Sequence, residues 1–311
     1  MTDKIIQRAV SKLERDAILP FQTLQPTLVV IHKPADQDDG AQSYLNNIKR
    51  IGEQYSVSVK DYDAATPFLA AELIKEVSKD PCVHGILITS DYGEVNRTLY
   101  NRIPVSLDID SLSTFSVGTL VGNNSPIAYR HAPCTAAACM KIIEALEEKN
   151  DFSGKTCLIV GRSMRVGRPL AEILTQKSMT VALAHSKSDL GVFSYSQWDY
   201  IVSAIGRHNY WGYEHQLPVH HTKPIRIIDV GMNVDENGKL CGDVDRKWFN
   251  ELPPLDRDNY ITPVIGGVGR MTTTVLFSKL FANATEYFKS STGALYIPTS
   301  GEYQNIAEGL A

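Results

Sequence analysis

The sequence lacks the features that mark membrane-spanning, secreted or nucleic-acid-binding proteins. No stretch approaches the roughly 18 consecutive apolar residues that a membrane-spanning helix needs. Positions 1–16 mix charged and apolar residues without an apolar core, so we expect no signal peptide there. Aromatic residues make up only 8%, and 31 Lys and Arg face 35 Asp and Glu, a formal charge of −4. A mildly acidic chain without a basic cluster is poorly suited to nucleic acid, so we expect neither nucleic-acid nor membrane partners.

Cysteine is also scarce. The chain has five cysteines and no Cys-x-x-Cys pair. An odd number without such a pair argues against a disulfide framework and against a zinc site, and we expect no bound metal. These features fit a protein of the reducing cytoplasm.

What is present is an alternation of strands and helices. A length of 311 residues corresponds to roughly two domains of about 150 residues each. The first part has a helix at 3–16, β-rich runs at 27–32, 56–62 and 85–89, helical spacing at 44–54 and 67–78, and a polar loop at 35–40. This order predicts a parallel α/β layer.

The second part repeats the alternation after a polar linker at 123–133. Strands are predicted at 156–160, 180–185, 200–204 and 226–230, a further short element at 260–264, and helices at 135–148, 169–177 and 271–289. This pattern is typical of a Rossmann-type domain. The predicted fold class is therefore α/β with two domains, the second of Rossmann type, followed by a C-terminal extension at 291–311.

The loop between the strand at 156–160 and the helix at 169–177 has the composition of a phosphate-binding turn. It reads Gly-Arg-Ser-Met-Arg-Val-Gly-Arg-Pro over 161–169. Glycines let the backbone approach a pyrophosphate, and the following helix offers free N–H groups at the positive end of its dipole. The spacing differs from Gly-x-Gly-x-x-Gly, so an ordinary tight turn is the alternative on the pattern alone.

The end of the next strand favours NADP over NAD. An NAD site places Asp or Glu about 20 residues after the glycine loop, where it binds the ribose 2′-hydroxyl. Here that place reads Ala-His-Ser-Lys over 184–187, without an acid, and Arg162 stands in the loop opposite. A hydroxyl and cations favour a 2′-phosphate instead. The alternative is that Arg162 and Lys187 are solvated surface cations.

Four separated stretches resemble one family. They are Pro133–Thr135, Val160–Pro169, Asp229–Asp245 and Thr262–Thr272. In this order and spacing they resemble the methylenetetrahydrofolate dehydrogenase/cyclohydrolase family of one-carbon metabolism, over about residues 3 to 289.

The resemblance implies two α/β domains across a cleft, with NADP on the second domain, a tetrahydrofolate derivative in the cleft and a homodimer. It implies a folate domain at 1–134, completed by a returning C-terminal helix at 272–290, and a cofactor domain at 135–271. It assigns the 2′-phosphate to Arg162 and Ser186. The full set of implied cofactor residues is Gly161, Arg162, Ser163, Val166, Gly167, His185, Ser186, Ile228, Gly267, Gly269 and Thr272.

The folate half departs from the family pattern. The family's helix carries Tyr-x-x-x-Lys, in which the tyrosine stacks on the folate and the lysine transfers protons in the cyclohydrolase step. Tyr44 matches, but the lysine position holds Ile48, which cannot carry a proton. Lys49 is one residue late and therefore rotated by about 100° around a helix. Unless a bulge shifts it, we expect Lys49 to be a surface cation.

Two further positions differ. Thr89 occupies the place of the family's glutamine, and Asp110, which matches the aspartate that binds the pterin, is followed by Ser111 where the family has glycine. An ordinary turn carboxylate is the alternative reading of Asp110. The implied catalytic positions are therefore Tyr44, Ile48, Thr89 and Asp110.

These departures affect the two reactions differently. Hydride transfer mainly requires that two carbons be held in line and water be excluded, whereas the cyclohydrolase step requires a group that activates water. We therefore expect an NADP-dependent methylenetetrahydrofolate dehydrogenase-like enzyme whose cyclohydrolase activity is lost or impaired, and Ile48→Lys should restore that step if the rest of the site is intact. The alternatives are an oxidoreductase for a different small molecule, and a catalytically silent relative that binds folate or nucleotide as a regulator.

Overall fold

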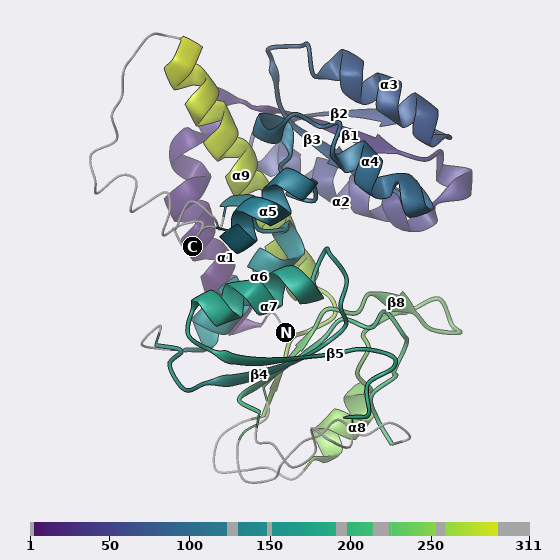
Figure 1. Cartoon of the computed structure of the whole chain (residues 1–311), viewed down its shortest axis with the longest axis vertical. Coiled ribbons are helices and arrows are strands. Elements are labelled where there is room, and N and C mark those ends of the chain that lie inside the picture. Colours follow the sequence, from purple (N-terminus) through teal and green to yellow (C-terminus); the bar gives the residue numbers. More distant parts are fainter. Residues whose placement is uncertain are drawn as a thin grey trace. The chain divides into compact units, whose positions relative to one another are not determined.

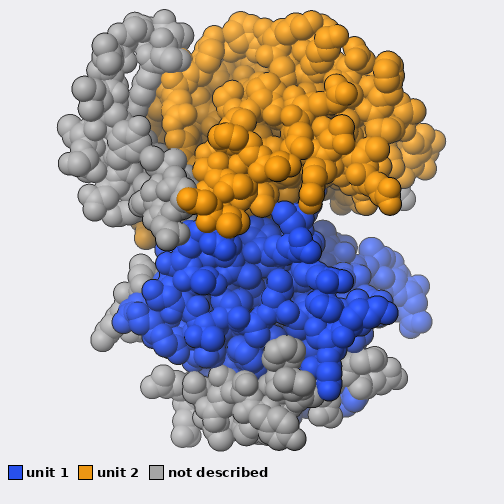
Figure 2. Space-filling view, viewed as in Figure 1, with its two compact units in different colours: residues 1–9, 135–272 blue, residues 10–134, 273–311 orange. Residues whose placement is uncertain are grey.

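The polypeptide divides into two units, which Figure 2 shows in different colours. A computed structural model describes residues 3–122, 130–147, 151–190, 198–213, 224, 226–252 and 259–291. Unit 1 comprises residues 1–9 and 135–272, and unit 2 comprises residues 10–134 and 273–311. Helix α9 (Val268–Ser291) begins in unit 1 and continues into unit 2. The predicted return of the C-terminal helix to the first domain is therefore confirmed.

Unit 2 is built on a parallel sheet of three strands in the order β2–β1–β3 (Figure 1). Its strands are β1 (Thr27–His32), β2 (Ser58–Asp63) and β3 (Val83–Ile88). Its helices are α2 (Asp39–Gln54), α3 (Pro67–Val77), α4 (Asn96–Tyr100) and α5 (Thr114–Gly122), and α1 (Lys4–Ala17) joins it from unit 1. Every residue of β1 is buried, as expected for the central strand of a parallel sheet. Because β2 and β3 lie on opposite sides of β1, right-handed crossovers place α2 and α3 on opposite faces of the sheet.

Helix α2 begins earlier than predicted, at Asp39 instead of residue 44, and the predicted loop at 35–40 is correspondingly shorter. Asp38 is the reason, because its carboxylate accepts a hydrogen bond from Ala41 N at 2.9 Å and so caps the helix. Apolar spacing alone missed this polar first turn. The helix continues to Gln54 as a regular α-helix, so no bulge brings Lys49 to the position of Ile48.

Unit 1 contains a parallel sheet of five strands in the order β10–β7–β6–β4–β5. The strands are β4 (Thr156–Val160), β5 (Thr180–Ala184), β6 (Tyr200–Ser203), β7 (Arg226–Asp229) and β10 (Tyr260–Ile261), and the helices are α6 (Cys134–Leu146), α7 (Gly167–Gln176) and α8 (Arg246–Glu251). The first strand of the sheet, β4, lies between β5 and β6, so the order of the strands reverses there. Ligands of open parallel sheets bind at the carboxyl ends of strands beside such a switch point. The predicted Rossmann-type fold is confirmed.

Some predicted elements of unit 1 have different limits. The element predicted at 260–264 is a strand only at Tyr260–Ile261, and α9 begins at Val268 instead of 271. The sequence did not predict the hairpin of β8 (Asn233–Val234) and β9 (Leu240–Cys241), or helix α8. These elements are too short to show a period.

Other sequence predictions concern what the chain does not carry. In the described ranges, the structure has no helix with both the length and the apolar character needed to cross a membrane. All five cysteines are free thiols. Most of the predicted linker at 123–133, and the extension beyond 291, lie outside the described residues.

Candidate functional site

The glycine loop after β4 lies at the switch point of the unit 1 sheet. Gly161 has a φ of +129°, which residues with a side chain rarely adopt. Its amide donates a hydrogen bond of 2.9 Å to Ala184 O at the end of β5. The hydroxyl of Ser163 accepts a hydrogen bond from Val166 N at 3.1 Å, which braces the turn just before α7. A braced glycine turn followed by a helix amino end is the arrangement that binds a dinucleotide pyrophosphate.

Gly167, the first residue of α7, leaves no room for a side chain. A Cβ at this position would lie 1.8 Å from Gly161 O, so the loop would have to open. We expect Gly167→Ala to lower the free energy of unfolding by about 1–3 kcal/mol and to weaken NADP binding about tenfold. Denaturant unfolding and calorimetric titration with NADP measure the two effects.

Gly118 provides the matched control. It lies exposed on α5 in unit 2, and a Cβ there would meet no atom within 4 Å. Gly118→Ala should leave NADP binding unchanged and stability equal or slightly higher. Unchanged NADP binding by Gly167→Ala would contradict the placement of the cofactor phosphates on this loop.

The predicted 2′-phosphate residues lie close together at the ends of two neighbouring strands. β4 and β5 run in parallel, with Val160 opposite Ala184. Arg162 therefore stands two residues beyond one strand end, and Ser186 stands two residues beyond the other. Both side chains are exposed, as is Lys187.

The turn after β5 is held in place by its own side chains. His185 N donates to Ser188 Oγ at 3.0 Å, and Lys187 N donates to His185 Nδ1 at 3.1 Å. No carboxylate occurs over residues 184–187. Exposed hydroxyls and cations at these strand ends, without an acid over residues 184–187, suit a phosphate better than a ribose hydroxyl.

A second glycine loop leads from β10 into α9. A Cβ at Gly267 would lie 1.8 Å from Pro263 O, so only glycine fits this turn. A Cβ at Gly269 would lie 3.2 Å from the methyl group of Met232, in the loop after β7. The loop after β7 thus lies against the first turn of α9.

Two of the predicted cofactor residues lack a free side chain. Thr272 is buried, and its hydroxyl donates to Val268 O at 2.9 Å. Ile228 lies inside β7 with 0% of its surface exposed, whereas Met232 beyond the end of the strand is 65% exposed. Met232 was not selected from the sequence because a methionine carries no motif signal of its own.

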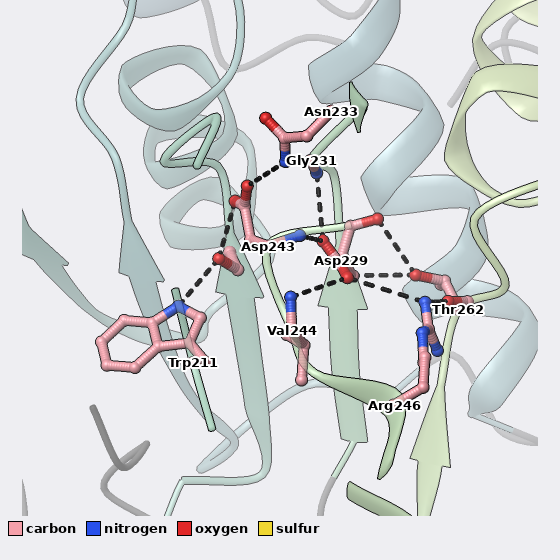
Figure 3. A network of polar contacts seen from close by, with 9 residues as sticks. Trp211, Asp229, Gly231, Asn233, Asp243, Val244, Arg246 and Thr262 are labelled. Carbon is pink, nitrogen blue, oxygen red and sulfur yellow. Dashed lines mark hydrogen bonds and ion pairs between the residues drawn. The ribbon is translucent and has the colours of Figure 1, made fainter. Parts of the chain in front are cut away.

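Two buried carboxylates, Asp229 and Asp243, connect the loops around the ends of β6 and β7 (Figure 3). Asp243 accepts hydrogen bonds from Ser203 Oγ at 2.9 Å, Ile205 N at 2.8 Å, Arg207 N at 3.0 Å and Asn233 Nδ2 at 3.1 Å. Asp229 accepts from Gly231 N at 3.1 Å, Asp243 N at 3.0 Å and Val244 N at 3.2 Å, and Arg246 Nη2 lies 3.6 Å away. The stretch Asp229–Asp245, noticed first as a motif, therefore fixes the strand ends that border the ligand edge of the sheet.

Burial raises the pKa of Asp229 to about 6 from its ordinary 3.8, and Asp243 acts in the same direction, while Arg246 and backbone N–H groups oppose the shift. Between these two pKa values the folded state binds more protons than the unfolded state. Stability from this group is therefore full below pH 3.8 and is lost as the pH rises through about 6.

We expect the free energy of unfolding of the wild type, relative to Asp229→Asn, to fall between about pH 4 and pH 7, by at most about 3 kcal/mol. Denaturant unfolding at several pH values measures this difference. Asp235 is an exposed control: hydrogen bonding from the amide of Lys239 lowers its pKa, so Asp235→Asn should give the opposite slope. If the unfolding free energy of the wild type, relative to Asp229→Asn, instead rises with pH, the raised pKa of Asp229 is contradicted.

In unit 2, helix α2 carries the first of the predicted folate residues. Tyr44 is half-buried, and Ile48, one turn further, has 0% of its surface exposed. Lys49 turns to β2 instead, with Nζ 2.7 Å from Asp61 Oδ1. Partial burial acts to raise the pKa of Asp61, but hydrogen bonding and attraction from Lys49 outweigh it and keep this pKa below its ordinary value. Lys49 is thus a surface ion-pair partner, as the sequence predicted.

Thr89 and Asp110 occupy two further places in unit 2. Thr89 directly follows β3, and its buried hydroxyl has no hydrogen-bond partner among the described residues. A buried polar atom without a protein partner calls for an explanation, and a ligand is one. Asp110 is 7% exposed and lies between β3 and α5 in the chain.

The sequence reasoning missed two side chains at the same edge of the unit 2 sheet. Lys33 follows β1, its amide donates to Ser90 Oγ at 2.9 Å, and its ammonium lies 5.2 Å from the centre of the Tyr92 ring. The hydroxyl of Tyr92 donates to Ala64 O, beyond the end of β2, at 2.7 Å. In the sequence, the only sign of a role for Lys33 and Tyr92 is that each follows shortly after a predicted strand.

Comparison with known proteins gives one consistent result. The profile described as tetrahydrofolate dehydrogenase/cyclohydrolase, NAD(P)-binding domain, matches residues 133–288. The bifunctional protein FolD of Janthinobacterium sp. (strain Marseille) is 38% identical over 270 residues, covering 84% of this chain and 88% of that protein. FolD of Streptococcus thermophilus (strain LMD-9) is 32% identical, covering 91% of this chain and 94% of that protein.

Solved structures agree with the sequence comparison. The bifunctional FolD methylenetetrahydrofolate dehydrogenase/cyclohydrolase of Campylobacter jejuni has a TM-score of 0.73 and 29% identity, covering 91% of this chain and 95% of that one. The enzyme of Thermoplasma acidophilum has a TM-score of 0.74 and 27% identity, covering 92% and 98%. The resemblance inferred from four short stretches is therefore confirmed, and the chain belongs to the tetrahydrofolate dehydrogenase/cyclohydrolase family.

Proposed function

We propose that this protein is an NADP-dependent 5,10-methylenetetrahydrofolate dehydrogenase in which the cyclohydrolase activity is lost or impaired. The observation that carries the dehydrogenase half is the edge formed by β4 and β5, where Arg162, Ser186 and Lys187 are exposed beside a glycine loop. The relatives named above are bifunctional methylenetetrahydrofolate dehydrogenase/cyclohydrolases, which supports the same reaction here.

NADP fits the residues present in unit 1. A Cβ at Gly161 would lie 2.3 Å from Ala204 O, and a Cβ at Gly167 would lie 1.8 Å from Gly161 O, so the two glycines allow the tight loop on which the pyrophosphate would lie. Arg162 and Ser186 would hold the 2′-phosphate. When bound, the cofactor supplies the acceptor for the hydride. Gly267 and Gly269 would allow the backbone to approach flat rings closely, and the buried pair of Asp229 and Asp243 would keep the neighbouring loops in place.

Unit 2 would hold the folate. Tyr44 is half-buried on α2, and its ring would stack on the substrate. The Asp110 carboxylate would accept hydrogen bonds from the pterin ring. Hydride transfer requires no proton transfer by the protein. Orienting the substrate and excluding water are therefore sufficient roles for unit 2.

The cyclohydrolase step would lack its proton carrier. Ile48 occupies the lysine position and is fully buried, and Lys49 is engaged with Asp61 on the surface. Thr89, in place of glutamine, is too short to reach as far. This protein would therefore release the methenyl product that its bifunctional relatives process further.

A substrate-omission assay tests the proposed function. Purified protein is mixed with methylenetetrahydrofolate and NADP, then with each alone and with NAD in place of NADP, and the methenyl product is followed. Product formation that requires both substrates supports the proposal. Its absence, with nucleotide binding retained, would favour a different substrate or a silent regulatory relative.

We also propose that two copies pair through unit 1 and that the protein works in the cytoplasm. Strand β5 is an edge of the unit 1 sheet, and Leu183 on it is 36% exposed. An uncovered edge with an apolar side chain favours pairing with a second copy. A folate substrate and five free cysteines fit a reducing compartment.

A further inference from the structure

The unit 2 sheet has a switch point of its own. In the order β2–β1–β3 the first strand lies between the other two, so the order of the strands reverses between β1 and β3. Ligands of open parallel sheets bind outside the carboxyl ends of the two strands at such a point. Here these ends carry Lys33 directly after β1, and Thr89 and Ser90 directly after β3. These residues therefore stand where a ligand of unit 2 is expected.

The backbone of Lys33 is held from both sides. Its amide donates a hydrogen bond to Ser90 Oγ at 2.9 Å, and its carbonyl oxygen accepts one from His32 Nδ1 at 2.8 Å. Ser90 is 1% exposed and His32 is 3% exposed, so both partners belong to the packed part of the sheet. The side chain of Lys33 therefore starts from a fixed point between the two strand ends.

The ammonium group of Lys33 lies over a fixed aromatic ring. Its Nζ is 5.2 Å from the centre of the Tyr92 ring, within the range of a cation–π contact. The hydroxyl of Tyr92 donates to Ala64 O at 2.7 Å, and its amide donates to Asn96 Oδ1 at 2.9 Å. Burial raises the pKa of Tyr92 to about 12, and Asp38 acts in the same direction, so the ring carries no charge. Tyr92 thus positions the ammonium group without neutralising it.

Lys33 also lacks the carboxylate partner that other lysines of unit 2 have. Lys49, Lys60 and Lys79 each pair with an aspartate or a glutamate. Lys33 forms no ion pair with any residue that the structure describes. A half-buried ammonium group that is held at a ligand edge, without a counter-charge from the protein, is suited to bind an anionic group of a ligand.

A second polar group at this edge has no protein partner. The hydroxyl of Thr89 is buried and makes no hydrogen bond within the described ranges. The amide of Thr89 donates to Ile31 O at 3.1 Å, which keeps the residue beside the end of β1. A buried hydroxyl without a partner is rare in folded proteins and calls for an explanation. A ligand at the ends of β1 and β3 explains it.

The two groups lie on opposite faces of the sheet, so a ligand that contacts both must be elongated. Ile88 and Tyr92 pack in the cluster on the α3 face, and Lys33 lies over Tyr92. Because side chains alternate along a strand, Thr89 points to the other face, which α2 covers. A ligand across this edge would place an anionic group at Lys33 and an uncharged part towards α2. A tetrahydrofolate has this form, since its ring system ends in a glutamate with two carboxylates.

We propose that Lys33 binds a carboxylate of the glutamate tail of the tetrahydrofolate substrate. The inference rests on the proposed function and deepens it, because it names the part of the substrate that unit 2 recognises by charge. The tail takes no part in hydride transfer. Lys33 would therefore set the affinity for the folate and leave the chemical step unchanged.

The test compares tetrahydrofolate with its diamide, in which both glutamate carboxylates are replaced by neutral carboxamides of similar size. In calorimetric titrations the wild type should bind tetrahydrofolate about tenfold more tightly than the diamide, as expected for a hydrogen bond between charged groups. Lys33→Met should bind the two compounds equally, with the affinity that the wild type has for the diamide. Lys33→Arg keeps the positive charge and should keep most of the preference.

Turnover provides a second readout. Lys33→Met should raise the KM for methylenetetrahydrofolate about tenfold, because a contact that is equally strong in the ground state and the transition state affects KM alone. The kcat and the KM for NADP should stay within about twofold of the wild type. Lys79→Met is the matched control, since it removes a paired lysine of unit 2 between α3 and the amino end of β3. It should leave both KM values unchanged.

Two outcomes would overturn the inference. One is equal binding of tetrahydrofolate and the diamide by the wild type, a comparison that depends on no variant. The other is an equal loss of affinity for both compounds in Lys33→Met, because the lysine would then act on the fold of the edge and not on the carboxylates. Either outcome, with tetrahydrofolate still bound by the wild type, rejects the inference alone. If the wild type binds neither compound, the proposed function and the inference are rejected together.

Discussion

Purified protein supplied with 5,10-methenyltetrahydrofolate should hydrolyse it no faster than buffer alone, or at least about 100-fold more slowly than it oxidises methylenetetrahydrofolate. General acid–base groups typically contribute about 10²–10⁴ to a rate. The position of the family's proton-transferring lysine holds Ile48, which is fully buried, and the nearest lysine in the helix is paired with Asp61. A direct assay of methenyl disappearance, with a bifunctional FolD as positive control, measures this ratio.

The structure changes what Ile48→Lys is expected to do. The sequence suggested that this change would restore the cyclohydrolase if the rest of the site were intact. Because Ile48 has 0% of its surface exposed, a lysine there would bury a charge at a cost of several kcal/mol. We now expect Ile48→Lys to lower the melting temperature and to gain no hydrolysis. Strong hydrolysis by this variant, or by the wild type, would contradict the account of unit 2.

Arg162→Ala should lower the preference for NADP over NAD by about 100-fold or more. A charged hydrogen bond contributes about 1.5–3 kcal/mol, and a guanidinium can make two to one phosphate. The side chain is exposed at the end of β4, and no carboxylate stands at the end of β5 to take a ribose hydroxyl instead. The loss should therefore appear in kcat/KM for NADP, with kcat/KM for NAD nearly unchanged.

The control for this prediction is Arg168→Ala. Arg168 is also exposed, but it lies on α7 and its guanidinium contacts Met164, 3.6 Å from the sulfur. Its removal should leave the NADP preference within about threefold of the wild type, because general charge near the loop is screened by salt. An equal loss in both variants would show that the preference depends on net charge instead of a specific pocket.

The sequence was sufficient for the parts of the fold that repeat. β1 and β4 have the predicted limits, 27–32 and 156–160, because buried parallel strands form nearly continuous hydrophobic runs. The phosphate loop was also predictable, since its glycines and the missing acid after β5 are properties of single positions. Helix starts were less predictable. Helix α2 begins earlier than its apolar spacing indicates because Asp38 caps it.

The rest of the site depends on contacts between distant residues. Lys33 is separated from Ser90 by 57 positions, and no local pattern announces their hydrogen bond. The pair of Asp229 and Asp243 was visible as part of a motif, but only the structure shows that each carboxylate accepts several hydrogen bonds. The burial of Ile48 likewise depends on packing that a single helix cannot reveal.

One time course tests the central claim most directly: protein, methylenetetrahydrofolate and NADP are mixed, and NADPH, methenyltetrahydrofolate and 10-formyltetrahydrofolate are measured together. We predict that methenyltetrahydrofolate accumulates in step with NADPH, and that the formyl product appears only at the rate of the enzyme-free control. NADPH formed with an equal amount of the formyl product would contradict the account, and so would the absence of NADPH.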